Sequence, residues 1–117
     1  MSLTLFQEHV QKWKDCERCE LSKTRKRVVI ARGKIPCDIF FVGIGPGRVE
    51  DVFGQPFVGP AGNLLSDIVE RALGKDSPLR VCFSNLVGCL PVDEEGKEVK
   101  PEVECIESCS PRLQEII

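Results

Sequence analysis

Hydrophobic residues recur along the chain in patterns that predict three helices. Residues 63–73 carry apolar residues on one helical face and are followed by Gly74, a residue type that commonly ends a helix. The apolar residues of 101–117 also recur at nearly helical spacing, although Pro111 predicts a break or kink there. Residues 3–13 have apolar positions close to helical spacing: Leu5, Phe6, Val10 and Trp13.

Continuous apolar runs predict the strands. Residues 38–43 form an unbroken run ending in glycine, which is typical of a strand buried on both faces of a parallel sheet. Residues 80–87 indicate a second strand, and the β-branched residues 28–30 indicate a short strand or an extended arm. The alternation of strands and helices predicts an α/β fold of three layers, α/β/α, with a short parallel sheet and a right-handed crossover through 63–73.

The loop that follows the first predicted strand is rich in glycine and is a candidate binding element. Residues 43–47 read Gly-Ile-Gly-Pro-Gly, which allows an anion or a nucleotide to approach the backbone. The spacing is neither that of a dinucleotide-binding fingerprint nor that of a P-loop. In open α/β sheets, ligands bind at the carboxyl ends of the strands, so we expect a site at this loop.

Composition and charge limit the classes of protein. The 117 residues predict one small domain, residues 1–117, and the hydrophobic share of 42% with 29% charged residues is typical of a globular protein. The net charge of −2 argues against a non-specific nucleic-acid binder, although the N-terminal third is basic and the C-terminal third acidic. Neither a membrane span nor a signal peptide is predicted, so we expect a cytoplasmic monomer without a membrane partner.

The seven cysteines predict a metal site rather than disulfides, because no secretion signal accompanies them. Cys16 and Cys19 form a C-x-x-C pair, whose spacing lets two thiolates reach one zinc ion or one iron–sulfur cluster. Cys37 and Cys82 lie in or beside predicted strands, and we expect them to be small buried hydrophobic residues. The remaining cysteines lie far from the pair in sequence: Cys89, Cys105 and Cys109.

Three linked motifs resemble the uracil-DNA glycosylase superfamily. They are the run FVGIGPGRVEDVFGQPFVGPAGNLL at residues 41–65, the run NLVGCLP at 85–91, and the run CSPRL at 109–113. The sequence looks most like family 4 of this superfamily, whose members carry a four-iron cluster. The resemblance covers nearly the whole chain.

The resemblance implies specific roles for several residues. A 4Fe-4S cluster would be held by Cys16, Cys19, Cys89 and Cys109, with Cys105 as the alternative fourth ligand because its distance from Cys89 also suits the family; zinc is the alternative metal. Uracil would be bound at Gly43 and Gly45. Phe57 would stack on the flipped base, and the Asn85 amide would offer the donor and acceptor that the uracil edge requires.

The chain departs from the family at the position that drives the chemistry. Family 4 has a glutamate where this chain has Ile44, and related families have Asp or Asn where it has Gly45. Neither residue polarises water, so the catalytic residue is unknown. A His-Pro-Ser-like motif is expected well beyond Ile117, and the single histidine, His9, is predicted to lie on the surface.

The implied function is DNA repair by base excision, with hydrolysis of the N-glycosidic bond of uracil in single- or double-stranded DNA. Three interpretations follow for this chain: a glycosylase with an unusual residue set, the N-terminal part of a longer fold, or a degenerate member that binds without cleaving. An alternative of another class is a structural or redox module that carries an iron–sulfur cluster or zinc.

Overall fold

A small mixed sheet organises the molecule, whose computed structural model describes residues 2–117. Strands β2 (Ile39–Gly43) and β3 (Val81–Asn85) run parallel, as predicted, with Gly43 opposite Asn85. The two-residue strand β1 (Arg32–Gly33) pairs antiparallel with β3, so the strand order is β1-β3-β2. The sheet is therefore mixed, because this short N-terminal strand adds an antiparallel edge to the predicted parallel pair.

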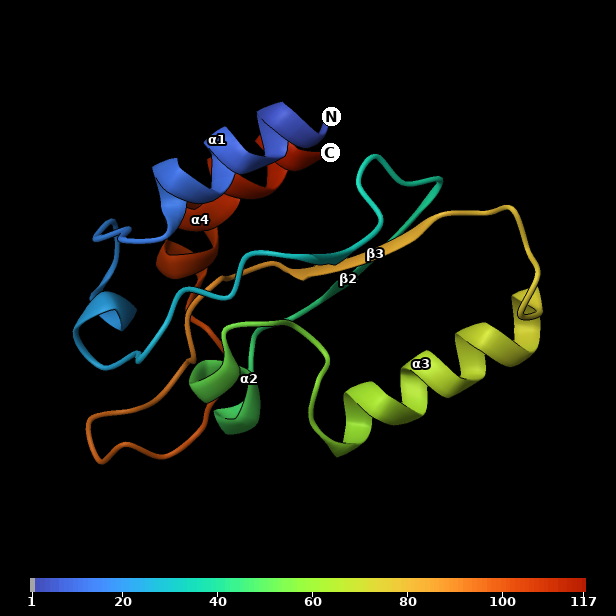
Figure 1. Cartoon of the computed structure of the whole chain (residues 1–117). Helices are drawn as coiled ribbons and strands as arrows, with labels where there is room; N and C mark the ends of the chain where they lie inside the picture. The colour runs from blue at the N-terminus through green and yellow to red at the C-terminus, as the bar shows by residue number, and fades with distance from the viewer. Residues whose placement is uncertain (1) are drawn as a thin grey trace.

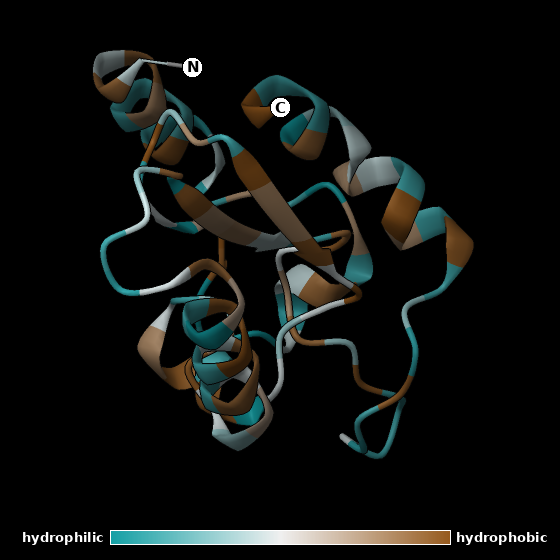
Figure 2. Cartoon of the chain, turned by 90° about the vertical axis from the view of Figure 1, so that its right-hand side faces the viewer, coloured by the Kyte–Doolittle hydropathy of each residue, from teal (hydrophilic) through white to brown (hydrophobic). Residues whose placement is uncertain are grey.

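Helices lie on both sides of the sheet and give the three layers that were predicted (Figure 1). Helices α1 (Leu3–Trp13) and α4 (Val103–Ile116) pack side by side on one side, whereas α2 (Arg48–Phe53) and α3 (Pro60–Leu73) lie on the other. The strands between them are predominantly hydrophobic (Figure 2). No helix within residues 2–117 combines the length and the apolar character needed to cross a bilayer.

The helices differ from the predictions in three places: the start of α3, the presence of α2 and the continuity of α4. Helix α3 begins at Pro60 rather than at residue 63, because proline is well suited to the first helical turn. The short helix α2 was not predicted. Helix α4 continues through Pro111 without ending. Proline has no N–H to donate to the carbonyl one turn earlier, and because Pro111 is exposed, water can bind that carbonyl instead.

The predicted arm at residues 28–30 belongs to no strand, and its residues Val29 and Ile30 are buried. The Val29 side chain is fully buried, and its N–H donates to the carbonyl of Gly88 at 2.6 Å. The carbonyl of Ile30 accepts a hydrogen bond from the hydroxyl of Ser84 on β3. This arm therefore forms part of the core and links the N-terminal segment to the end of β3.

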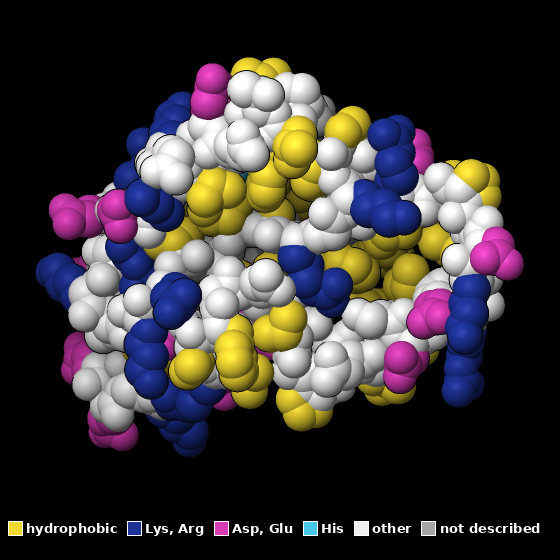
Figure 3. All heavy atoms as spheres, in the orientation of Figure 1, with side chains coloured by type: hydrophobic (Ala, Val, Ile, Leu, Met, Phe, Trp, Pro, Cys, Tyr) yellow, Lys and Arg dark blue, Asp and Glu magenta, His cyan; other side chains and the backbone are white. Residues whose placement is uncertain are grey.

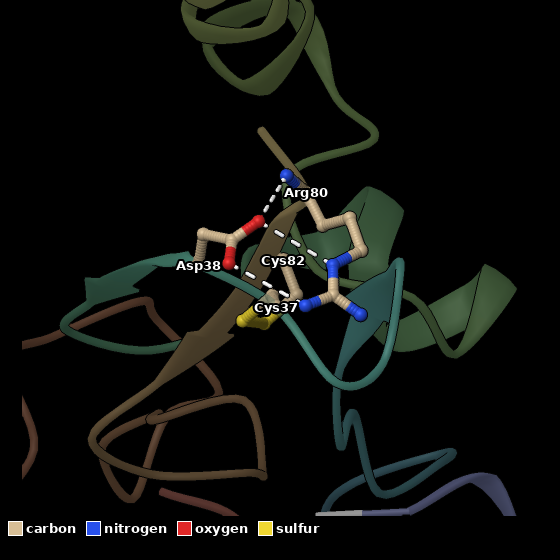
Figure 4. Close-up of a disulfide and its surroundings, with 4 residues drawn as sticks. All are labelled: Cys37, Asp38, Arg80 and Cys82. Atoms are coloured by element: carbon tan, nitrogen blue, oxygen red, sulfur yellow. Dashed lines mark hydrogen bonds and ion pairs between the residues drawn. A yellow bond between two sulfur atoms is a disulfide. The ribbon is translucent and has the colours of Figure 1, made fainter. Parts of the chain in front are cut away.

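Cys37 and Cys82 form a disulfide, which corrects the prediction that the chain lacks such bonds (Figure 4). The loop before β2 folds back over β3, with the N–H of Asp38 donating to the Arg80 carbonyl at 2.8 Å. This contact brings the two Cα atoms to 6.0 Å, inside the usual range for a disulfide. The prediction of burial is confirmed for Cys82, whereas it is wrong for Cys37, which is half-buried.

His9 is buried, which corrects the prediction of a surface histidine. Its side chain packs between α1 and α4 with 1% exposure, and its Nδ1 lies 3.0 Å from the carboxylate of Glu115. The inward face of α1 is formed by His9 and Trp13, whereas Leu5 is 53% exposed. The polar residue faces inward because α4 supplies the carboxylate that satisfies its Nδ1.

The α1–α4 contact is expected to weaken in acid. Burial lowers the pKa of His9 below its ordinary 6.5, and hydrogen bonds from Lys12 and then His9 lower the pKa of Glu115 to about 2. Both folded-state pKa values lie below the unfolded ones, so the unfolded chain binds more protons as pH falls. The free energy of unfolding should therefore fall first below the ordinary pKa of His9 and again below the ordinary 4.5 of Glu115.

Urea unfolding measured between neutral pH and pH 4, followed by circular dichroism, checks this expectation. The variant His9→Gln should be less stable at neutral pH but should lose less stability as the pH falls through the range of histidine. Parallel pH profiles for the variant and the parent would show that His9 does not titrate in this range.

Candidate functional site

The carboxyl ends of β2 and β3 bring three of the predicted site residues together. Gly43 and Asn85 are register partners, and the N–H of Leu86 donates to the Gly43 carbonyl at 2.9 Å. A Cβ atom placed on Gly43 would lie 2.5 Å from Oδ1 of Asn85 and 2.6 Å from Cζ of Phe57. The phenylalanine ring and the amide therefore both pack against Gly43, and only glycine leaves room for them.

Phe57 is held in an unusual backbone conformation by an arginine behind its loop. Its φ is +56°, in the left-handed region, which costs a non-glycine residue about 1–3 kcal/mol. Arg32 donates from Nε to the carbonyl of Pro56 at 2.6 Å and from Nη2 to the carbonyl of Phe57 at 2.9 Å. The same guanidinium stacks 4.3 Å over the Phe83 ring, which in turn contacts the Phe57 ring. Arg32 thus fixes the loop that presents Phe57.

Glu50 on α2 fixes the same loop from the other side. Its Oε2 accepts hydrogen bonds from the N–H groups of Val58 and Gly59 at 3.1 and 2.6 Å, and its Oε1 accepts one from Gly47 at 3.0 Å. One carboxylate therefore ties the glycine loop to the Phe57 loop. Sequence reasoning missed this role. The available signal was a glutamate three residues after Gly47, the spacing of a capping box.

Asn85 combines burial with an uncommitted side-chain amide. Asn85 is only 3% exposed, and its backbone carbonyl accepts a hydrogen bond from Arg112. Among the described residues, no hydrogen bond involves the side-chain amide of Asn85. A donor and an acceptor are thus available beside the Phe57 ring.

Two other residues of the motif have different surroundings. Ile44 is 56% exposed and, as an aliphatic residue, offers no group that activates water. Gly45 lies away from the Phe57 ring, since a Cβ there would meet Val87 and Pro91 at 3.0 and 3.1 Å. The structure therefore does not bring Gly45 into the Gly43–Phe57–Asn85 cluster.

Asp51, the other acid of the motif, has a structural role. It is buried, and its Oδ1 accepts hydrogen bonds from the N–H groups of Lys26 and Arg27 at 2.8 and 3.4 Å. Asp51 thereby anchors the basic segment between α1 and β1. Lys and Arg side chains gather on the side of the molecule where that segment runs (Figure 3).

Four of the five cysteines outside the disulfide line one small cavity. The cavity lies between the segment after α1, the end of β3 and the helix α4. Cys105 is not part of its lining. It lies beside the cavity, in a hydrophobic cluster that also contains Cys89 and against which Cys109 packs. The four lining cysteines are Cys16, Cys19, Cys89 and Cys109.

N–H groups point at two of these sulfur atoms. Sγ of Cys109 accepts from the backbone N–H of Gly88 at 3.3 Å and from Nε of Arg112 at 3.2 Å. Sγ of Cys89 lies 3.7 Å from Nη1 of Arg25. Such donors stabilise negative charge on sulfur and are typical of the surroundings of metal-bound thiolates.

Burial opposes ionisation of two thiols in the absence of a metal. Burial raises the pKa of Cys89 to about 11, with the Arg25 charge acting in the opposite direction. Burial, followed by the neighbouring Cys19, raises the pKa of Cys105 to about 11. A metal that binds at Cys89 must therefore displace a proton, so its affinity will rise with pH.

Comparison with known proteins assigns the family. The family model described as the Uracil DNA glycosylase superfamily matches residues 30–117. The chain belongs to the uracil DNA glycosylase superfamily. It is 39% identical over 112 residues to the type-4 uracil-DNA glycosylase of Saccharolobus solfataricus, an alignment that covers 96% of this chain and 48% of that protein.

Other curated relatives of this superfamily member carry the same name. The type-4 uracil-DNA glycosylase of Sulfurisphaera tokodaii is 38% identical over 98 residues, which cover 84% of this chain and 42% of that protein. The corresponding protein of Thermotoga maritima is 35% identical over 92 residues, with coverages of 79% and 47%. The chain thus spans about half the length of the curated relatives it matches.

Proposed function

We propose that this chain recognises uracil in DNA and forms the base-binding and cluster-binding part of a type-4 uracil-DNA glycosylase. The observation that carries this proposal is the packing of the Phe57 ring and the Asn85 amide against Gly43 at the carboxyl edge of the parallel strands. An aromatic face binds the π surface of a flipped base, and an amide pairs with the uracil edge. The substrate would be single- or double-stranded DNA that contains uracil.

The cysteine cavity supports a 4Fe-4S cluster held by Cys16, Cys19, Cys89 and Cys109. Within residues 2–117, no three acidic, histidine or cysteine side chains converge closely enough to hold a single metal ion. A zinc ion needs all its sulfur ligands about 2.3 Å from one point. A cluster binds each thiolate through a different iron, so its four ligands surround a larger volume. Four cysteines that line one cavity without converging on a single point favour the cluster over zinc.

The cluster would supply a structural link rather than a reacting group. Its ligands come from the segment after α1, from the turn after β3 and from α4, which are otherwise distant in sequence. By holding these segments together, the four cysteines would stabilise the end of β3 that carries Asn85. The base pocket and the cysteine cavity would then depend on one another.

A second candidate function is base or nucleic-acid binding without cleavage. Ile44 is the observation that favours it, because this exposed aliphatic side chain stands where family 4 has a glutamate. Cleavage requires a group that positions water or stabilises the cationic sugar. Binding requires neither, so Phe57 and Asn85 suffice for this alternative.

Replacement of single cysteines is expected to show which cysteines bind the cluster and which do not. The variant Cys109→Ala should lose most of its iron and its broad visible absorption after anaerobic purification, because a cluster ligand is removed. The variant Cys105→Ala, one helical turn away on α4, is the matched control and should keep both. Iron and sulfide content per chain are the measurements.

Two results would contradict this proposal. A colourless parent protein that carries one zinc ion per chain would exclude the cluster while leaving the fold assignment intact. Loss of iron in Cys105→Ala but not in Cys109→Ala would show that the fourth ligand is Cys105.

A further inference from the structure

Arg112 on α4 is a buried cation without an acidic partner. Arg112 is 1% exposed, and no carboxylate among the described residues forms an ion pair with it. Its guanidinium donates instead to the Ser84 hydroxyl at 3.1 Å, to the Ile30 carbonyl at 3.3 Å and to the carbonyl of Asn85. Its Nε donates to Sγ of Cys109 at 3.2 Å. One side chain thus contacts both the cysteine cavity and the strand end that carries Asn85.

The charge of this guanidinium is stabilised most strongly by a nearby anion. Arginine stays protonated in proteins, and an uncompensated buried charge is strongly unfavourable. Of the groups that Arg112 contacts, carbonyls and a hydroxyl remain neutral, and only the Cys109 sulfur becomes negative when it is bound to a metal. The burial of Arg112 is therefore best compensated when Cys109 is a metal-bound thiolate.

We propose that Arg112 is a positioning residue that couples the cysteine cavity to the base-binding site. Through one guanidinium, the thiolate at Cys109 fixes the peptide of Asn85 and hence the direction in which the Asn85 amide faces the base. This inference rests on the proposed function. It adds a residue that touches neither base nor DNA, and it makes base affinity depend on the state of the cysteine cavity.

Two other arginines provide matched comparisons, because each serves one of the two sites. Arg25 donates to Sγ of Cys89 and to the carbonyl of Cys16 but makes no contact with the base-binding residues. Arg32 donates to the carbonyls of Pro56 and Phe57 but contacts no cysteine of the cavity. Of these three arginines, Arg112 is the one that contacts both sites.

The test compares Arg112→Lys, Arg112→Met, Arg25→Lys and Arg32→Lys with the parent protein. The cysteine site is followed by iron content and by the midpoint potential of the cluster. The base-binding site is followed by the NMR signal of the Asn85 side-chain amide and by the dissociation constant for free uracil. Arg112→Lys keeps the charge and most of the volume, so it decides the question if Arg112→Met does not fold.

Both Arg112 variants should lower the midpoint potential, because a lost N–H···S bond no longer stabilises the reduced cluster. They should also shift the Asn85 signal and weaken uracil binding about tenfold, the effect of one misplaced hydrogen-bonding group. Arg25→Lys should change the potential alone, and Arg32→Lys should change uracil binding alone.

The outcomes separate this inference from the proposed function. If the parent holds a cluster and binds uracil, but the Arg112 variants alter only one of the two sites or neither, the coupling is overturned and the proposed function stands. If the parent takes up no cluster and binds no uracil, both are overturned.

Discussion

Replacement of Ile44 by glutamate is expected to raise the rate of uracil excision by about 10²–10⁴-fold, the usual contribution of one positioned general base or charge stabiliser. Ile44 follows β2 directly and is exposed, so a carboxylate there meets solvent without a burial cost. The parent chain is expected to excise uracil very weakly or not at all. The measurement is single-turnover incubation with single-stranded DNA that contains one uracil.

The variant Ile44→Gln is the matched control, since it has nearly the same shape as glutamate but carries no charge. It should stay close to the parent if a negative charge is what the site lacks. Efficient excision by the unmodified chain would contradict this expectation and show that another group positions the water. Asp51 is a poor candidate for that group, because backbone N–H groups already occupy its Oδ1. If the parent and both variants bind the DNA but none of them cleaves it, the second candidate function is favoured.

The variant Gly43→Ala is expected to weaken uracil binding strongly while the protein remains folded. The added methyl group would lie 2.5 Å from Oδ1 of Asn85 and 2.6 Å from Cζ of Phe57, so both side chains must move. Overpacking of this kind typically costs about 1–3 kcal/mol, which is a loss of roughly fivefold to 150-fold in affinity if it falls on the bound state. The measurement is an NMR titration with free uracil, with a thermal melt to check folding.

Gly45→Ala is the comparison within the same loop. A methyl group there meets Val87 and Pro91 rather than the Phe57–Asn85 pair, and it should leave uracil binding nearly unchanged. Equal losses in the two variants would show that the loop backbone, and not the space around Phe57 and Asn85, determines binding. Unchanged binding by Gly43→Ala would remove the proposed base site.

Local patterns in the sequence were sufficient to predict the parallel strands and the residues at their ends. The run 38–43 is apolar without interruption, and strands buried on both faces have this pattern. The carboxyl ends of parallel strands meet at one edge, so the neighbourhood of Gly43 and Asn85 followed from topology. The position of Phe57 followed only from the resemblance to the family.

Sequence reasoning preferred Cys109 to Cys105 because of the CSPRL motif at residues 109–113, but it left Cys105 open as the alternative ligand. These residues are four positions apart on α4, and residues at that spacing share a helix face. Their chemistry and their distance from Cys89 are similar as well. The cavity separates them in the structure, since Cys109 lines it and accepts hydrogen bonds from Gly88 and Arg112, whereas Cys105 is not part of the lining. The ligand assignment itself stays a prediction.

What the sequence by itself determined is the set of elements whose signal is local: the strand runs, the helix faces, the C-x-x-C pair and the family motifs. Tertiary structure alone decided the burial and the contacts of the polar and sulfur side chains whose partners lie far away along the chain. The disulfide joins residues 45 positions apart, the His9–Glu115 contact joins residues 106 apart, and Arg112 reaches Ile30 across 82. The physical reason is that a charged or polar residue is ordinarily placed at the surface, and it can be buried only where the fold brings a hydrogen-bonding partner to it.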